Sequence, residues 1–317
     1  MARATGPIAD LSYRNYDGPM FDVTNRWWVI AKMVLRQSLK KKGFWAWTLL
    51  STMGYVFLSV VYYFMDTMQQ SGGALNRAPA VLNTVVWKDH FYLAFDMAQL
   101  WIFFLSLLVG AGVVASDTRA NALLVYLSKP VSKLDYLLGK WFGMFLMLVL
   151  VTGVPAIVFL GFTWLSYRQQ GTWDSLLLFK ALLVIALPAV LHASVMLGLS
   201  SMFTQPRLAG ATYAGIYFLS TFIASIMLGM SFRNHERGIE ASNDASYLSI
   251  DGLIEGLTKV ILGTRGAVQF PPSRSAEAAF AVAPPSGLMV LAAYLVVCGI
   301  FIAIAWKRVR AVEVVGS

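Results

Sequence analysis

The residue types that perform bond chemistry are few and widely separated in this 317-residue chain. Its three histidines, His90, His192 and His235, have no HExxH or CxxC companion, so their spacing does not predict a metal site. The chain contains neither a GxxxxGKS/T phosphate loop nor a GxSxG nucleophile turn. Its single cysteine, Cys298, cannot form a disulfide within the chain. We therefore expect no catalytic residue and no bound metal here.

Polar side chains inside long apolar runs are the next candidates, because their burial in hydrocarbon is costly. Asp96 and Gln99 lie one helical turn apart in one such run, and His192 lies midway along another. These three residues could line a polar pathway. They could equally form hydrogen bonds between helices or be solvated at the membrane surface, and this second interpretation is the more common one.

The elements that must position these residues are membrane spans. The chain is 58% hydrophobic and only 13% charged, whereas an ordinary soluble domain is about 25% charged. Six predominantly apolar runs are long enough to cross a hydrocarbon core of about 30 Å. The predicted fold class is therefore an all-α integral membrane protein with these six transmembrane helices: Phe44–Met65, Phe91–Ala115, Leu137–Tyr167, Leu176–Phe203, Leu208–Phe232 and Gly287–Trp306.

The basic residues predict the orientation of the spans. Lys40, Lys41 and Lys42 directly precede the first span, and Lys307 and Arg308 directly follow the last one. Basic residues beside spans mark the cytoplasmic side, so we expect both termini in the cytoplasm. The net charge of +9 then reflects membrane orientation and gives no reason to expect a nucleic-acid partner.

Two further helices are predicted to be amphipathic and not to span. In residues 24–40, apolar positions form one face, and Lys32 and Arg36 lie on the opposite one, which is typical of an interfacial helix that contacts lipid or a partner. In the long outer loop between the last two spans, apolar residues recur with helical spacing from Ile250 to Ile261, and Gly263 is a candidate C-terminal stop. We expect this second helix on the outer membrane surface or as a cap on the bundle.

The segment between the second and third spans is the most distinctive. It begins with the charged residues Asp117 and Arg119 and continues into an apolar group, Leu123, Leu124 and Leu127. Pro130 should end this short helix, because the residue before a proline is disfavoured in the α conformation. Ser132 or Asp135 can cap the next helix. A rigid cytoplasmic loop results, with an apolar ridge that a soluble partner could hold and with the two charges at its rim.

The run from Leu127 through Pro130, Val131 and Ser132 to Gly139 and Lys140 resembles the loop after the second span in permeases of type-2 ABC exporters, where it reads L-S-x-P-V-S-x-x-x-x-L-x-G-K. The basic C-terminal tail and the six-span plan are also similar to that family. The sequence departs from the family at a Gly-Thr step, which here is Ala120-Asn121. We expect the turn of the loop to differ there.

The resemblance implies a permease subunit that dimerises, as a homodimer or heterodimer, in the bacterial cytoplasmic membrane. A separate ABC ATPase would bind ATP and Mg²⁺, so this chain would need no cofactor. The implied coupling residues are Asp117, Arg119, Leu123, Leu124, Leu127 and Pro130. The implied organisation is a cytoplasmic segment (1–43), a permease domain (44–306) with a coupling loop (116–135) and an external loop (233–286), and a cytoplasmic tail (307–317).

Two other classes fit the same spans. A secondary transporter or channel would need no ATPase, but such proteins often contain repeated halves, and none is evident here. A membrane anchor for a multiprotein machine would not transport at all. The sequence does not select among lipid, polysaccharide, drug, peptide and protein cargo.

Overall fold

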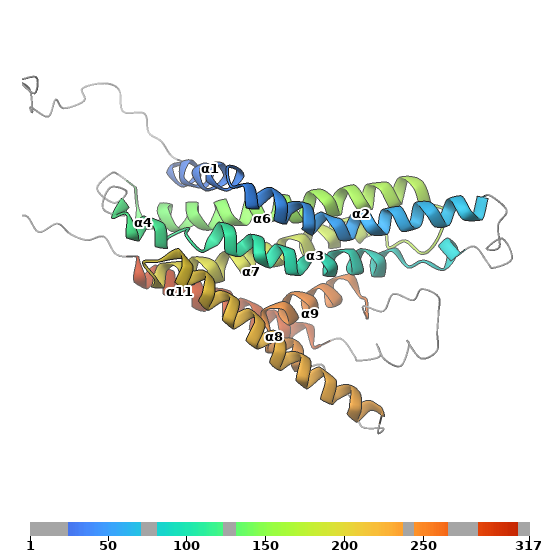
Figure 1. Ribbon diagram of the computed structural model, residues 1–317. Coiled ribbons are helices and arrows are strands. Elements are labelled where there is room, and N and C mark those ends of the chain that lie inside the picture. Colours follow the sequence, from blue (N-terminus) through green and yellow to red (C-terminus); the bar gives the residue numbers. More distant parts are fainter. Residues whose placement is uncertain (1–24, 71–80, 123–130, 237–243, 266–284, 310–317) are drawn as a thin grey trace, which may run out of the picture.

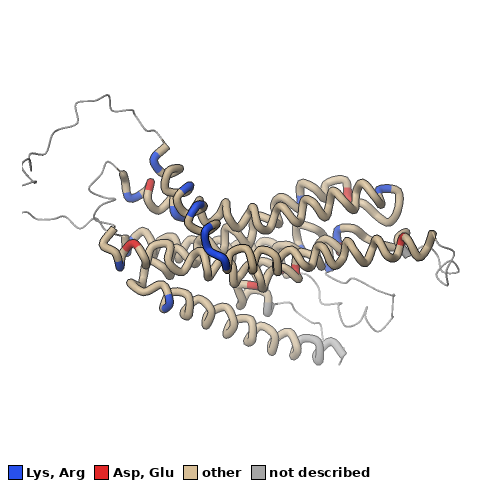
Figure 2. The backbone as a smooth tube through the Cα atoms, turned by 45° about the horizontal axis from the view of Figure 1, so that its top comes forward, with Lys and Arg blue, Asp and Glu red and all other residues tan. Residues whose placement is uncertain are grey.

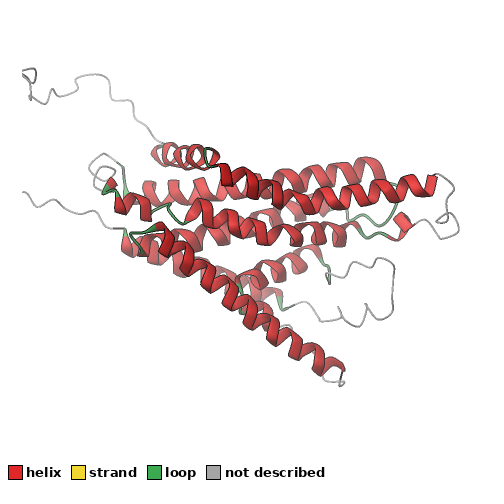
Figure 3. Ribbon diagram, viewed as in Figure 1, coloured by secondary structure: helices red, strands yellow, loops and turns green. Residues whose placement is uncertain are grey.

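The computed structural model describes residues 25–70, 81–122, 131–236, 244–265 and 285–309. Within these ranges the chain is helical and forms no strand (Figure 3). The elements are α1 (Arg26–Leu39), α2 (Lys42–Gln70), η2 (Val81–Thr84), α3 (Trp87–Gly110), α4 (Ala115–Arg119), α6 (Lys133–Tyr167), α7 (Leu177–Met202), α8 (Pro206–Glu236), η3 (Asp244–Tyr247), α9 (Ile250–Leu262) and α11 (Gly287–Arg308).

Six helices are long and apolar enough to cross a membrane, which confirms the predicted fold class. They are α2, α3 with α4, α6, α7, α8 and α11, and their bounds lie within a few residues of the predicted ones. The most deeply buried of them is α7, whereas α8 and α11 present most of their surface to the outside. The core is therefore built around α7, with α3 and α6 packed beside it.

Helices α2, α3, α6 and α7 run along one common direction, whereas α8 diverges from them toward one end (Figure 1). The short helix α9 occupies the wedge between α8 and the rest of the bundle and contacts α3, α7, α8 and α11. The C-cap of α9 is Gly263 in the left-handed conformation, at φ 64°, as predicted. Leu253 and Leu257 are buried, so the predicted stripe of α9 packs against the chain's own spans.

Helix α1 packs along α6 at the end of the bundle that also holds α4 and the end of α11 (Figure 1). Its predicted apolar face is buried, with Ile30, Ala31 and Val34 at most 5% exposed. The close approach requires glycine in α6, because a Cβ on Gly139 would lie 2.5 Å from the carbonyl oxygen of Trp27. The predicted N-terminal helix is thus present, and its apolar stripe contacts α6.

Candidate functional site

The second span is broken near the end that holds α1. Helix α3 ends at Gly110 and α4 begins at Ala115, and we call the intervening residues 111–114 the α3–α4 break. One hydroxyl of α7 satisfies the backbone there: Ser200 Oγ accepts hydrogen bonds from the amides of Val114 and Ala115, both at 3.0 Å, and donates one to the carbonyl of Ala111 at 2.9 Å. The direction in which α4 leaves the bundle is therefore fixed by α7.

A buried ion pair connects α4 to the first turns of α6. Lys140 Nζ lies 2.7 Å from Asp117 Oδ2, and the two side chains are 2% and 14% exposed. The hydroxyl of Tyr136 donates a second hydrogen bond to the same carboxylate oxygen at 2.8 Å. A buried charge is stable only when it is paired and hydrogen-bonded. Lys140 supplies the opposite charge for Asp117, and Tyr136 supplies a further hydrogen bond.

The last turn of α3 is held from the other side by α2. Lys41, which directly precedes α2, donates a hydrogen bond from Nζ to the carbonyl of Leu108 at 2.6 Å. Gly110 allows α6 and α7 to approach, because a Cβ there would lie 2.7 Å from side-chain atoms of both Met144 and Met196. The α3–α4 break is thus enclosed by α2, α6 and α7.

Of the predicted coupling residues, the structure describes Asp117 and Arg119. Arg119 is exposed at the end of α4, as a contact for a partner would require. Asp117 does not lie free at a rim, because its carboxylate is bound within the chain. Leu123, Leu124, Leu127 and Pro130 lie outside the described residues. At the step where the sequence departs from the resembled family, Asn121 adopts φ 52°, a left-handed conformation that asparagine tolerates.

Sequence reasoning missed Tyr136, Lys140 and Ser200 as parts of this site. A signal existed for Lys140, since a lysine inside an apolar run needs a counter-charge and the preceding loop offers two carboxylates, Asp117 and Asp135. Ser200 gave no signal, because serine is common in membrane helices and only the broken backbone opposite it reveals its role. The sequence left the cap of this helix open between Ser132 and Asp135. Ser132 is the N-cap, and it forms a capping box with Asp135 at the start of α6.

The three predicted pathway residues do not form one row. His192 is buried in α7, where its Nδ1 is hydrogen-bonded to the hydroxyl of Tyr213 at 2.5 Å, and its ring faces Phe103 of α3. Asp96 precedes Phe103 by two helical turns, a distance of about 10 Å along α3. Gln99 is buried, and its Nε2 donates to the carbonyl of Phe95 at 3.0 Å, whereas its Oε1 has no hydrogen-bond partner among the described residues.

Asp96 instead belongs to a polar group that α9 completes. Glu255 of α9 accepts a hydrogen bond from the Tyr92 hydroxyl at 3.0 Å and forms an ion pair with Lys259. Asp96 lies within electrostatic reach of Glu255, of Lys259 and of Asp251. Burial, with a contribution from the nearby Glu255 charge, raises the pKa of Asp251 to about 6. We call Tyr92, Asp96, Asp251, Glu255 and Lys259 the α9 polar group, and within it the hydrogen bond from Tyr92 to Glu255 joins α3 to α9.

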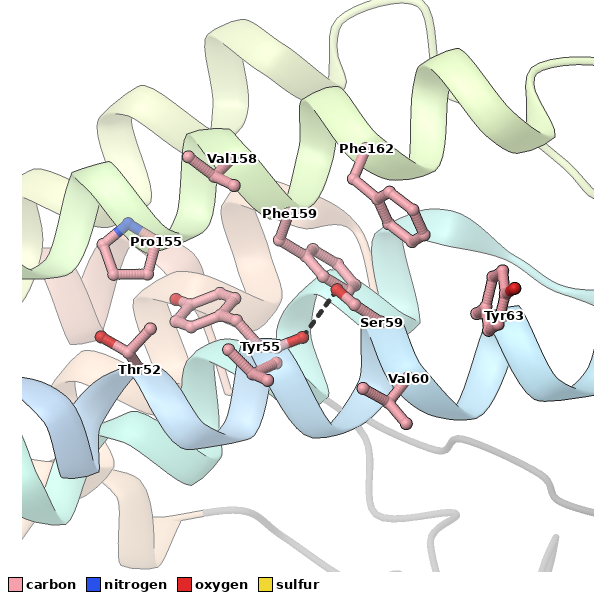
Figure 4. Close-up of a pocket in the computed structure, with 10 residues that line it drawn as sticks. Thr52, Tyr55, Ser59, Val60, Tyr63, Pro155, Val158, Phe159 and Phe162 are labelled. Carbon is pink, nitrogen blue, oxygen red and sulfur yellow. Dashed lines mark hydrogen bonds between the residues drawn. The ribbon is translucent and has the colours of Figure 1, made fainter.

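A groove of about 410 Å³ opens between α2 and α6 beside Pro155 (Figure 4). Its lining is almost entirely apolar, and the Ser59 hydroxyl donates a hydrogen bond to the backbone carbonyl of Tyr55 at 2.8 Å. The Tyr55 hydroxyl is buried and has no partner among the described residues. The groove contains no ionisable carboxylate, histidine or lysine, so it offers contacts to apolar matter and no group for acid–base chemistry.

The family model for ABC-2 family transporter proteins matches residues 28–309. This chain belongs to the ABC-2 transporter family. The match begins in the first turn of α1 and ends at the C-cap of α11, so the permease family accounts for nearly every element described above. No curated protein matches the sequence. An ABC-2 permease is a multi-pass component of a membrane transporter, and its own activity is transport and not bond chemistry.

Proposed function

We propose that this ABC-2 permease forms the translocation pathway of an ATP-driven exporter and that a separate ABC ATPase docks at the end of the bundle that carries α4. That ATPase would bind ATP and Mg²⁺, so the permease itself needs no cofactor. Two permease copies, identical or different, would enclose the pathway. The broad exposed faces of α8 and α2 suit such an interface as well as contact with lipid.

The observation that carries this proposal is the attachment of α4 to two different spans. Its exposed Arg119 is available to a partner, whereas Asp117 is tied to α6 and the amide of Ala115 is tied to α7. A force applied to α4 from outside the membrane would therefore reach both α6 and α7. Helix rearrangement of this kind is a standard way to switch a bundle between two access states.

The charge distribution supports a cytoplasmic location for this end. Lys and Arg residues gather around α1 and α4, and fewer lie at the opposite end (Figure 2). Positive residues beside spans remain on the cytoplasmic side during insertion. We therefore propose that both termini face the cytoplasm of a bacterial inner membrane and that the 168–176 turn and η2 face outward.

Charge reversal at α4 tests ATPase docking. Arg119→Glu should reduce co-purification of the ATPase in mild detergent and reduce stimulation of its ATP turnover by the permease. Arg168→Glu is the matched control, because Arg168 is also exposed but lies at the opposite end of the bundle. Equal ATPase recovery and equal turnover for both variants, at equal permease yield, would refute docking at α4.

Cysteine labelling tests the orientation. In a Cys298→Ser background, Asn83→Cys should react with a membrane-impermeant maleimide added outside intact cells, and Lys40→Cys should not. Both positions are exposed in the structure, so a difference in reaction reports the side of the membrane and not burial. The opposite labelling pattern would contradict the proposed orientation.

A further inference from the structure

A second cleft, of about 540 Å³, lies between the last turns of α6 and the start of α7, at the end opposite to α1. We call it the α6–α7 cleft. One wall is α6, including Leu160 and Trp164, and the other is formed by Trp173 and the first turn of α7. Its volume is in the range of small-molecule sites, about 300–1,000 Å³.

The depth of the α6–α7 cleft is set by a glycine. Gly161 lies six residues before the end of α6, which places it about 9 Å below that end. A Cβ built on Gly161 meets no other atom within 4 Å, so the space above this residue is open. The deeper part of the cleft is lined by apolar side chains alone and can hold a hydrocarbon chain.

The wall formed by Trp173 is rigid. Its ring stacks on that of Trp87 at 5.1 Å, and its Nε1 donates a hydrogen bond to the carbonyl of Tyr167 at 3.2 Å. Trp164, on the opposite wall, is 52% exposed. Tryptophans at the end of a span are characteristic of the level of lipid headgroups. The mouth of the cleft therefore lies at the membrane surface.

Asp174 lines the mouth of the cleft, and Lys180, its ion-pair partner, lies beside the lining residues. Asp174 and Lys180 form an ion pair at 2.5 Å, and their side chains are 23% and 26% exposed. The hydrogen bond from Lys180, helped by one from the amide of Leu176, lowers the pKa of Asp174, so this carboxylate is ionised at neutral pH. A ligand with an apolar body and a headgroup carrying both a phosphate and an amine would complement this arrangement.

The surroundings select lipid as the source of such a ligand. Leu165, Leu178 and Phe179, around the cleft, are 73%, 58% and 61% exposed. Exposed apolar residues at this density, on helices that span a membrane, face acyl chains. We propose that the α6–α7 cleft binds a zwitterionic glycerophospholipid, with an acyl chain over Gly161, the phosphate at Lys180 and the amine at Asp174.

The test is photo-crosslinking in vesicles with phosphatidylethanolamine that carries a diazirine on one acyl chain. Labelled peptides from residues 157–178 are quantified by mass spectrometry. Gly161→Leu places a larger side chain in this space, where an added Cβ meets no atom within 4 Å, and should lower this labelling at least fivefold. Gly299→Leu in α11 is the matched control, since Gly299 is also open, and it should label like the wild type. Equal labelling of all three proteins would overturn the proposal.

A headgroup series tests the polar contacts. Phosphatidylethanolamine should label the cleft several times more strongly than phosphatidylglycerol, which lacks the amine, and diacylglycerol should label it least. Asp174→Asn should abolish the stronger labelling by phosphatidylethanolamine than by phosphatidylglycerol. Lys180→Gln should abolish the stronger labelling by phosphatidylglycerol than by diacylglycerol. Equal labelling by all three lipids would overturn the headgroup assignment. Disulfide formation between chains through Gly161→Cys, in a Cys298→Ser background, would mean that a second copy covers the cleft and would refute lipid occupancy.

Discussion

Removing either charge of the ion pair between Asp117 and Lys140 should destabilise this permease strongly. Lys140 is 2% exposed, so Lys140→Met leaves the Asp117 carboxylate without its cation, and Asp117→Asn leaves a buried ammonium without its anion. Loss of one member of a buried pair costs about 3–5 kcal/mol. Since Asp117 keeps 14% exposure, we expect the lower end of that range, about 3 kcal/mol, for each single variant.

The double variant distinguishes an ion pair from two independent packing roles. With both charges removed, no buried charge is left alone, so Asp117→Asn with Lys140→Met should be more stable than the sum of the single effects by about 1–3 kcal/mol. Equilibrium unfolding in mixed detergent micelles provides the free energies. Lys32→Met is the control, because Lys32 is exposed on α1, and it should change stability by less than about 0.5 kcal/mol.

Additive single effects would refute this account of the ion pair. So would a cost below about 1 kcal/mol for Asp117→Asn, because that value is typical of an exposed pair. Either outcome would also weaken the proposed coupling, since α4 would then lack its firm attachment to α6.

Three further predictions concern the break, α9 and α1. Ser200→Ala should leave the amides of Val114 and Ala115 without an acceptor, at a cost of about 1–3 kcal/mol for each amide at most, and should speed hydrogen exchange in the α3–α4 break. Ser201→Ala is the control and should not change this exchange, because the Ser201 hydroxyl bonds only within its own helix. Folding raises the pKa of Asp251 to about 6, so the folded state holds this proton more tightly than the unfolded state. The melting temperature of the wild type should therefore fall, relative to that of Asp251→Asn, as the pH rises from about 4 to about 6. Melting temperatures that change in parallel with pH in the two proteins would contradict this. Gly139→Ala should lower thermal stability by forcing α1 away from α6, whereas Gly161→Ala, in open space, should be neutral or slightly stabilising.

The six spans could be predicted from the sequence because a membrane imposes one requirement on composition and length. Local signals were equally informative. The N-cap of α6, predicted as Ser132 or Asp135, and the stop at Gly263 depend on a few neighbouring residues. Ser132 is the N-cap, and Gly263 ends α9 where predicted. The apolar face of α1 was also predicted correctly, and only its partner, α6, was not.

Contacts between distant segments could not be predicted in this way. The periodicity of α9 shows that one face is buried but does not say against what, and the wedge beside α8 becomes visible only in three dimensions. The proximity of Asp96 to Glu255 depends on this packing, because Glu255 is 159 residues away in the chain. The α3–α4 break is marked in the sequence only by Gly110 and Gly112, within an apolar run that continues through it.

The weakness of α4 on its own explains why its attachments matter. Five residues are far too few to form a stable isolated helix, since nucleation is unfavourable and helices shorter than about 12 residues are marginal in water. Its position is therefore set by Asp117 and Ser200, the contacts to α6 and α7.

Separating α4 from both spans would leave the buried Lys140 ammonium without its anion, at about 3 kcal/mol, and leave two amides unpaired, at about 1–3 kcal/mol each. A push on α4 that supplies less than this total cannot detach it. The response that costs less free energy is for α4 to move together with the ends of α6 and α7. A short helix that is unstable on its own can therefore transmit a force from a soluble partner to the membrane-spanning helices.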